Sequence, residues 1–134
     1  MTSKLSDLPQ DLLREGHRIQ KAASGDSMLP SIPDGTVLLI EPLCKNNVGL
    51  GDVVYFLDDK GNTKVHRISC VLIRGRKTLI QTWGDNCDKP DAVIKGSQIL
   101  GRVIAYRGEY QWHQMDSRAI MYAKYFLKKY GWYY

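Results

Sequence analysis

Turn signals recur through the middle of this sequence about every eight to twelve residues, with no helical stretch between the runs that they separate. The clearest turns lie at residues 33–35, where the sequence reads Pro-Asp-Gly, at residues 58–62 and at residues 75–77. Valine, leucine, isoleucine and threonine fill the runs on either side, as is typical of strands. The pattern therefore predicts a mainly β fold, in which a small antiparallel sheet is barrel-like or coiled.

The expected elements are short and belong to one domain. A helix is predicted at residues 9–15, because Pro9 suits a first helical turn and Gly16 can end the helix. One domain is expected for residues 1–134, with residues 22–106 as the β body, since a chain of this length can bury a single core. Strands are predicted at residues 17–23, 36–41, 52–57, 63–70, 71–74, 78–83 and 98–106.

Residues 116–130 are expected to form a C-terminal amphipathic helix, because their apolar side chains recur with a helical period. Asp116 or Ser117 could cap its start, and Gly131 its end. Two interpretations stay open for this segment. Its apolar face packs on the β body, or residues 117–134, which are basic and end in three aromatic residues, contact an anionic membrane surface.

The sequence as a whole limits which compartment and which partners are expected. Its first residues lack the apolar core of a secretory signal, and no run of about eighteen apolar residues occurs. The cysteines, Cys44, Cys70 and Cys87, form no Cys-x-x-Cys pair, which fits free thiols in a reducing compartment. A soluble cytoplasmic protein is expected, with contact to the inner face of the membrane through residues 117–134 as the alternative. The net charge of +5 is the only feature that points to nucleic acid, so no nucleic-acid partner is expected.

Three separate segments carry residues that suit nucleophilic catalysis. A serine hydroxyl is a poor nucleophile at neutral pH, so it needs a base within hydrogen-bond reach and a third group that orients this base. Ser27, His66 and Asp91 could form such a set. Their segments are Gly25-Asp26-Ser27-Met28-Leu29-Pro30, Val65-His66-Arg67, and Gly84-Asp85-Asn86 followed by Asp91.

In this order, and with an Asp-Gly turn and a Gly-Asp-Val-Val strand between them, the three segments resemble the serine peptidases of the signal peptidase and LexA-repressor clan. The resemblance covers roughly residues 22–106. It implies a β-rich peptidase body in which Ser27 begins a short turn and faces a base on a neighbouring strand. Bacterial signal peptidases and LexA-like proteins use a lysine base, whereas the endoplasmic-reticulum and archaeal type has histidine in a Val-His-Arg context, as here at His66. The clan's further aspartate matches Asp91, and Asp85 is the aspartate of the Gly-Asp-Asn box.

Two positions leave alternatives. Strand alternation sends Lys64 and His66 to the same face, but the Val-x-Arg frame aligns His66 with the base. Asp91 is the preferred partner of His66, with Asp85 as the other candidate; Asp85 could instead hold its loop through hydrogen bonds to the backbone. A histidine base is chemically coherent, because an ordinary imidazole with a pKa of about 6.5 accepts a proton at neutral pH.

The remaining site residues follow from the same turn. The backbone N–H of Ser27 is the predicted oxyanion donor. Many bacterial signal peptidases have a serine two residues before the nucleophile; this chain has Gly25 there, so the second donor is unidentified and Ser24 is its only weak candidate. Substrate contacts are expected from Met28, Ile32 and Val53. No cofactor or metal is expected, because the spacing of His66, Cys70 and Cys87 matches no zinc pattern.

These features predict a soluble serine endopeptidase that processes a peptide or protein precursor. The chain departs from signal peptidases in having no membrane anchor before the serine, which leaves a secretory preprotein in doubt as the substrate. A non-catalytic peptide-binding module on the same fold is the first alternative. A self-cleaving protein of the LexA kind is the second, although the 26 residues before Ser27 are too few for a DNA-binding domain and a cleavable linker.

Overall fold

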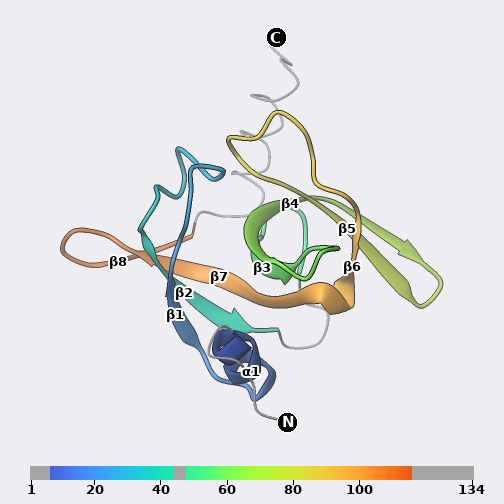
Figure 1. The fold of residues 1–134 in the computed structure, drawn as a ribbon, viewed down its shortest axis with the longest axis horizontal. Helices are drawn as coiled ribbons and strands as arrows, with labels where there is room; N and C mark the ends of the chain where they lie inside the picture. Colours follow the sequence, from blue (N-terminus) through green and yellow to red (C-terminus); the bar gives the residue numbers. More distant parts are fainter. Residues whose placement is uncertain (1–6, 44–47, 116–134) are drawn as a thin grey trace.

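The described residues, 7–43 and 48–115 of a computed structural model, form one curled antiparallel sheet of eight strands that follows a short helix (Figure 1). The elements in chain order are α1 (Leu8–Arg14), β1 (Ile19–Ala22), β2 (Val37–Pro42), β3 (Val53–Leu57), β4 (Thr63–Arg74), β5 (Lys77–Trp83), β6 (Ile94–Lys95), the 3₁₀ turn η2 (Gly96–Gln98), β7 (Ile99–Arg107) and β8 (Trp112–Gln114).

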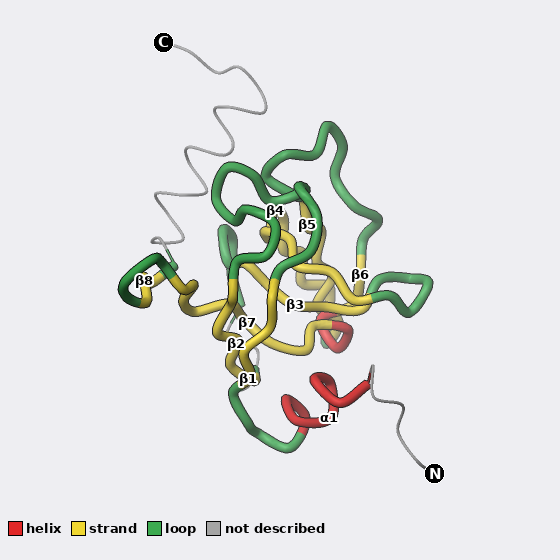
Figure 2. The backbone as a smooth tube through the Cα atoms, turned by 60° about the vertical axis from the view of Figure 1, so that its left-hand side comes forward, coloured by secondary structure: helices red, strands yellow, loops and turns green. Residues whose placement is uncertain are grey.

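The sheet has the order β1-β2-β7-β3-β4-β5-β6, and β8 pairs with the end of β7. β4 changes its neighbour along its length: residues 63–67 pair with β3, and residues 67–74 pair with β5 across a register shift between Ile68 and Cys70. Such irregularities bend a strand and increase its twist. The loop between β1 and β2 and the loop between β5 and β6 rise on the same side of the curled sheet, where they meet (Figures 1 and 2).

Two clusters of buried apolar side chains hold the sheet together. Alternate residues of β3 enter different clusters, because successive side chains of a strand point to opposite faces. Val53 and Tyr55 belong to the first cluster, and Val54 and Phe56 belong to the second. The first also receives Leu13 of α1, so the helix covers one side of the sheet.

The predicted mainly β architecture is confirmed, with its antiparallel strands and short N-terminal helix. The runs at 63–70 and 71–74 are one strand, β4, and the short strands β6 and β8 lie outside every predicted range. The predicted C-terminal helix at 116–130 lies outside the described residues. Within those residues, no helix has the length and apolar character needed to cross a membrane.

Candidate active site

Ser27 lies in the loop after β1, between two anchored segments. Gly25, which has a φ of +86°, begins the turn in a conformation that favours glycine, and its N–H donates a hydrogen bond of 2.7 Å to Oδ1 of Asp34. On the other side, Met28 and Ile32 are buried in the first core cluster, and the N–H of Ile32 donates to the Met28 carbonyl at 2.9 Å. This anchoring keeps Ser27, which is partly exposed, in a fixed place at the surface.

His66 stands on β4 opposite Val54, and its ring meets the edge of the Phe56 ring with centroids 6.2 Å apart. The imidazole is buried, and both of its nitrogens have partners. Nε2 lies 3.0 Å from Oγ of Ser27, and Nδ1 lies 2.5 Å from Oδ2 of Asp91. The fold thus brings three residues from the β1–β2 loop, β4 and the β5–β6 loop into one continuous chain of contacts.

Asp91 is hydrogen-bonded to Thr82 of β5 as well as to His66. The hydroxyl of Thr82 donates to Oδ2 of Asp91 at 2.7 Å, and the Asp91 N–H donates to the Thr82 carbonyl at 2.9 Å. Burial raises the pKa of Asp91, but the hydrogen bonds from His66 and Thr82 outweigh it, so this pKa lies below its ordinary value. An ionised carboxylate only accepts hydrogen bonds. Nδ1 of His66 therefore carries the ring proton, and in the neutral ring Nε2 accepts from Ser27.

Asp85, the other carboxylate considered for His66, contacts Arg67 instead. Both oxygens of Asp85 accept from the Arg67 guanidinium, at 2.9 and 3.0 Å, and the two side chains are 6% and 1% exposed. Arg67 also donates to the Gly51 carbonyl at 2.8 Å, and the Ser31 hydroxyl donates to Asp85 at 2.6 Å. The prediction that Asp85 could orient His66 is thus corrected: Asp85 forms a buried ion pair with Arg67 and, through Ser31, links β4 to the serine loop. The alternative that Asp85 holds its loop through the backbone is also corrected, because its side chain contacts the side chains of Arg67 and Ser31.

Asn86 of the Gly-Asp-Asn segment forms hydrogen bonds directly to the serine turn. The N–H of Asn86 donates to the carbonyl of Ser27 at 2.9 Å, and its side-chain amide donates to the carbonyl of Asp26 at 3.1 Å. These contacts were not predicted from the sequence, nor was the ion pair of Arg67. The sequence did contain a signal for both residues: Arg67 directly follows His66, and Asn86 directly follows Asp85, in the segments that suggested the site.

A groove with a volume of about 570 Å³ opens in front of Ser27 and His66. Its apolar wall includes Met28, Ile32 and Tyr55, whereas Val53 is buried in the core and does not line it. Val53 is therefore corrected from a substrate contact to a core residue. The other lining residues are Lys21, Ala22, Ala23, Ser24, Gly25, Leu38, Thr63, Lys64 and Val65.

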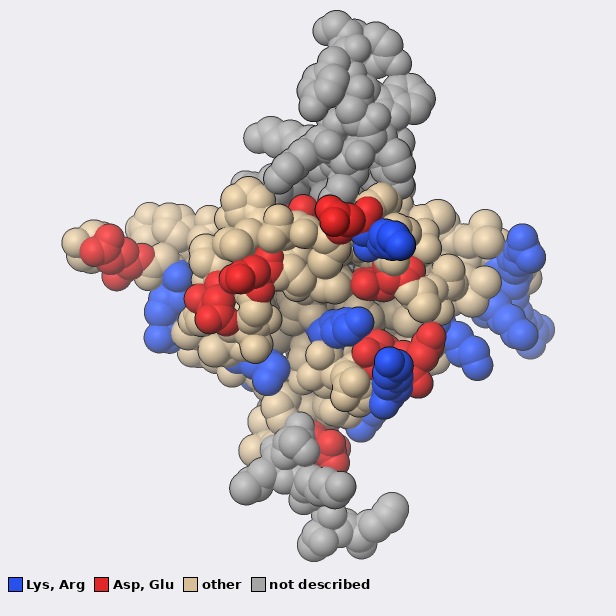
Figure 3. Space-filling view, turned by 45° about the horizontal axis from the view of Figure 1, so that its top comes forward, with Lys and Arg blue, Asp and Glu red and all other residues tan. Residues whose placement is uncertain are grey.

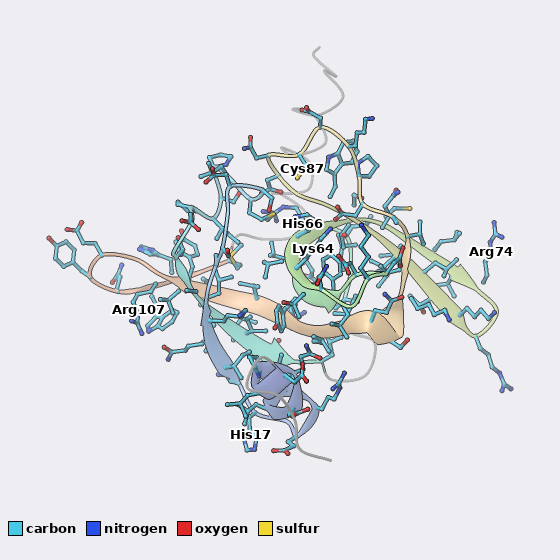
Figure 4. The ribbon with its side chains drawn as sticks, in the orientation of Figure 1. His17, Lys64, His66, Arg74, Cys87 and Arg107 are labelled. Atoms are coloured by element: carbon cyan, nitrogen blue, oxygen red, sulfur yellow. The ribbon has the colours of Figure 1, made fainter. Side chains whose placement is uncertain are left out.

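Lys64, the alternative base, lies beside His66 on β4 (Figure 4). Its Nζ is 3.6 Å from a carboxylate oxygen of Asp58, in an ion pair across the β3–β4 turn. The hydroxyl of Ser27 has His66 as its hydrogen-bond partner. The geometry thus places His66, rather than Lys64, in contact with the Ser27 hydroxyl.

Ser27, whose backbone N–H is the predicted oxyanion donor, lines the groove. Among the described residues, the backbone N–H of Ser27 has no hydrogen-bond partner, whereas the N–H of Gly25 is taken by Asp34. Ser24 is exposed and lines the groove. The N–H of Ser27 can therefore donate to a substrate carbonyl oxygen that enters the groove.

The described residues hold no group of three or more histidine, cysteine, aspartate and glutamate side chains that could bind a metal ion. Cys70 is an exposed free thiol on β4, and the Sγ of Cys87 lies 3.9 Å from the carbonyl oxygen of Ser27. In comparisons with known proteins, no family model, curated protein or solved structure matches this chain.

Gly84 has no room for a side chain, which gives a test of the site's packing. A Cβ at this position would lie 2.7 Å from the Ser27 carbonyl oxygen and 3.1 Å from Nε2 of His66. Gly84→Ala is expected to lower the free energy of unfolding by about 1–3 kcal/mol, because overpacking forces the backbone to shift. Urea unfolding measures this change. Gly96→Ala is the matched control, since its Cβ would meet ordinary contacts at 3.4 Å or more; equal effects of the two substitutions would contradict the predicted crowding.

Proposed function

We propose that this protein is a serine peptidase that hydrolyses peptide bonds of a polypeptide precursor, with a body like that of the signal peptidase and LexA clan. One observation carries the proposal: Ser27 Oγ, His66 Nε2 and Nδ1, and Asp91 Oδ2 form an unbroken chain of contacts of 3.0 and 2.5 Å at the wall of a groove. Nucleophile, base and orienting carboxylate are the parts that acyl transfer needs.

In the first half of the proposed reaction, Ser27 Oγ attacks the carbonyl carbon of the substrate while His66 Nε2 takes the hydroxyl proton. The carbonyl oxygen becomes an oxyanion, which the Ser27 N–H stabilises. His66 then gives its proton to the amide nitrogen, the C–N bond breaks and the amine product leaves. The substrate's acyl group remains bound to Ser27 as an ester.

Water completes the reaction. His66 Nε2 takes a proton from a water molecule that attacks the ester carbonyl, and it returns this proton to Ser27 Oγ when the C–O bond breaks. The second product carries a free carboxylate. Asp91 stabilises the imidazolium in both halves and keeps Nδ1 as the donor.

The groove suits an extended peptide. β1 stands at one end of the sheet order, so one of its edges has no strand partner among the described residues. Residues 63–66 of β4 pair with β3 on one side and precede the segment that pairs with β5 on the other. Both open edges line the groove. A substrate strand between them can form main-chain hydrogen bonds to each, which is a common mode of peptide recognition.

A peptide-library digest tests the proposal. The purified protein is incubated with a mixture of proteome-derived peptides, and new termini are identified by mass spectrometry. The peptidase predicts a reproducible set of fragments whose sequences align around one cleavage position. Retention of particular peptides on the protein without any new termini would instead identify a non-catalytic binding module, and fragments of the protein itself would identify self-cleavage. The expected compartment is the cytoplasm, where an exposed free thiol such as that of Cys70 persists.

A further inference from the structure

The hairpin of β4 and β5 projects from the body and ends in a surface that the proposed catalysis does not use (Figure 1). The strands are joined by a two-residue turn between the paired residues Arg74 and Lys77, and Gly75 in this turn has a φ of +62°. Beyond Val71, which still packs on the second core cluster, the side chains of β4 are exposed. We call the end of this hairpin the basic tip; it comprises Leu72, Ile73, Arg74, Arg76 and Lys77.

The basic tip concentrates positive charge. Three of its five residues are cationic and exposed, and Figure 3 shows lysine and arginine side chains gathered where the hairpin projects. Arg74, labelled in Figure 4, points away from the molecule. The ion pairs of the described residues include none of these three cations. Their charge is therefore available to an external anionic surface.

The same tip exposes apolar side chains. Ile73 is 70% exposed and Leu72 is 43% exposed, on opposite faces of the same strand. Leu72 pairs across the hairpin with Leu79, and Ile73 pairs with Thr78. Because both faces of the hairpin end carry an apolar residue beside the cations, the tip can enter an interface that is anionic outside and apolar beneath.

We propose that the basic tip docks on the surface of an anionic lipid bilayer, with the cations at the headgroups and Ile73 and Leu72 in the boundary layer. Basic residues beside exposed apolar side chains are the combination that interfacial binding uses. A nucleic-acid surface would use the cations but leave Ile73 and Leu72 in water, and the tip has no aromatic residue on which a base could stack. The apolar pair therefore favours lipid.

Docking in this way would hold the groove close to the bilayer. His66 and Arg74 lie on the same strand, eight residues apart, which corresponds to roughly 25 Å along β4. The groove would thus meet polypeptide segments that leave the membrane surface. This inference goes beyond the proposed peptidase function and does not depend on it, because bilayer binding is measured without turnover.

Vesicle sedimentation with the full chain tests the docking. The unaltered protein should partition onto vesicles of phosphatidylglycerol and phosphatidylcholine, and much less onto phosphatidylcholine alone. Each cation at an anionic surface contributes about fivefold to binding, so Arg74→Gln, Arg76→Gln and Lys77→Gln together should lower the partition coefficient on the order of 100-fold. Ile73→Ser should lower it by about tenfold, because the apolar contact is lost.

A matched triple variant separates the effect of the basic tip on binding from the effect of net charge. Arg14→Gln, Lys60→Gln and Lys89→Gln remove the same charge from exposed positions elsewhere and should change the partition coefficient by less than about twofold. Residues 117–134 are unchanged in every variant, so they cannot produce the difference. An equal loss in both triple variants, or an Ile73→Ser protein that binds vesicles like the parent, would overturn the proposal. A tip variant that loses binding only to a DNA duplex would assign the tip to nucleic acid and also overturn it.

Discussion

Replacement of Ser27 by alanine is expected to lower kcat on a cleaved peptide by about 10⁶-fold, the scale found when a serine peptidase loses its nucleophile. The reason is direct: the hydroxyl that lies 3.0 Å from Nε2 of His66 is the proposed nucleophile, and alanine has no atom that could form the acyl-enzyme. Peptide binding should persist, because the groove walls are unchanged. The free energy of unfolding should change by no more than about 1 kcal/mol, since Ser27 is partly exposed and loses one hydrogen bond. Initial rates, peptide titrations and urea unfolding measure the three quantities.

Ser31→Ala is the matched control for this substitution. Ser31 lies in the same loop, and its hydroxyl donates to the buried Asp85 at 2.6 Å. Its loss should cost about 1–3 kcal/mol of stability, because a buried charged acceptor loses a partner, while the nucleophile stays in place. Ser27→Ala should therefore lower activity with little effect on stability, whereas Ser31→Ala should lower stability with little effect on activity. An Ser27→Ala protein that cleaves peptides at the parental rate would refute the proposed nucleophile.

The strand framework could be predicted because its signals are local. Turn residues at 33–35, 58–62 and 75–77 separate β-prone runs. The first two turns lie between two strands of the structure, and the third joins β4 to β5, with Lys77 as the first residue of β5. The continuity of β4 could not be predicted in this way. The strand changes its partner from β3 to β5 at Arg67, just before a register shift between Ile68 and Cys70, and the choice of partner depends on residues far away in the sequence. The short strands β6 and β8 carry too few residues for a periodic signal.

Only the site residues that lie in recognisable sequence motifs could be predicted. Ser27, His66 and Asp91 came from three recognised segments, and they lie in contact. Val53 was misplaced because four consecutive residues of β3, Val53 to Phe56, are buried, so hydrophobicity alone does not say which of them faces a groove. Tyr55 is the residue of this strand that lines it. The distinction needs the register of the sheet, which no single segment contains.

The two aspartates of the β5–β6 region give the second large prediction, because the same substitution should have different consequences at each. Asp91→Asn is expected to lower kcat by about 10⁴-fold with little change in stability. An amide beside Nδ1 of His66 can donate to it, which places the ring proton on Nε2 and removes the acceptor for the Ser27 proton. Rates measured across pH are the readout, since a tautomer effect changes the pH profile and a purely structural one does not.

Asp85→Asn should instead act on folding. Its carboxylate is the counterion of Arg67, and the two side chains are 6% and 1% exposed, so the amide would leave a buried guanidinium charge without compensation. Removing one partner of a buried ion pair costs about 3–5 kcal/mol, a large part of the 5–15 kcal/mol that stabilises a typical domain. The activity of the molecules that remain folded should stay closer to that of the parent than in Asp91→Asn. If Asp85→Asn lost activity without losing stability, Asp85 rather than Asp91 would be the residue on which the base depends, and the assignment of the orienting carboxylate would be wrong.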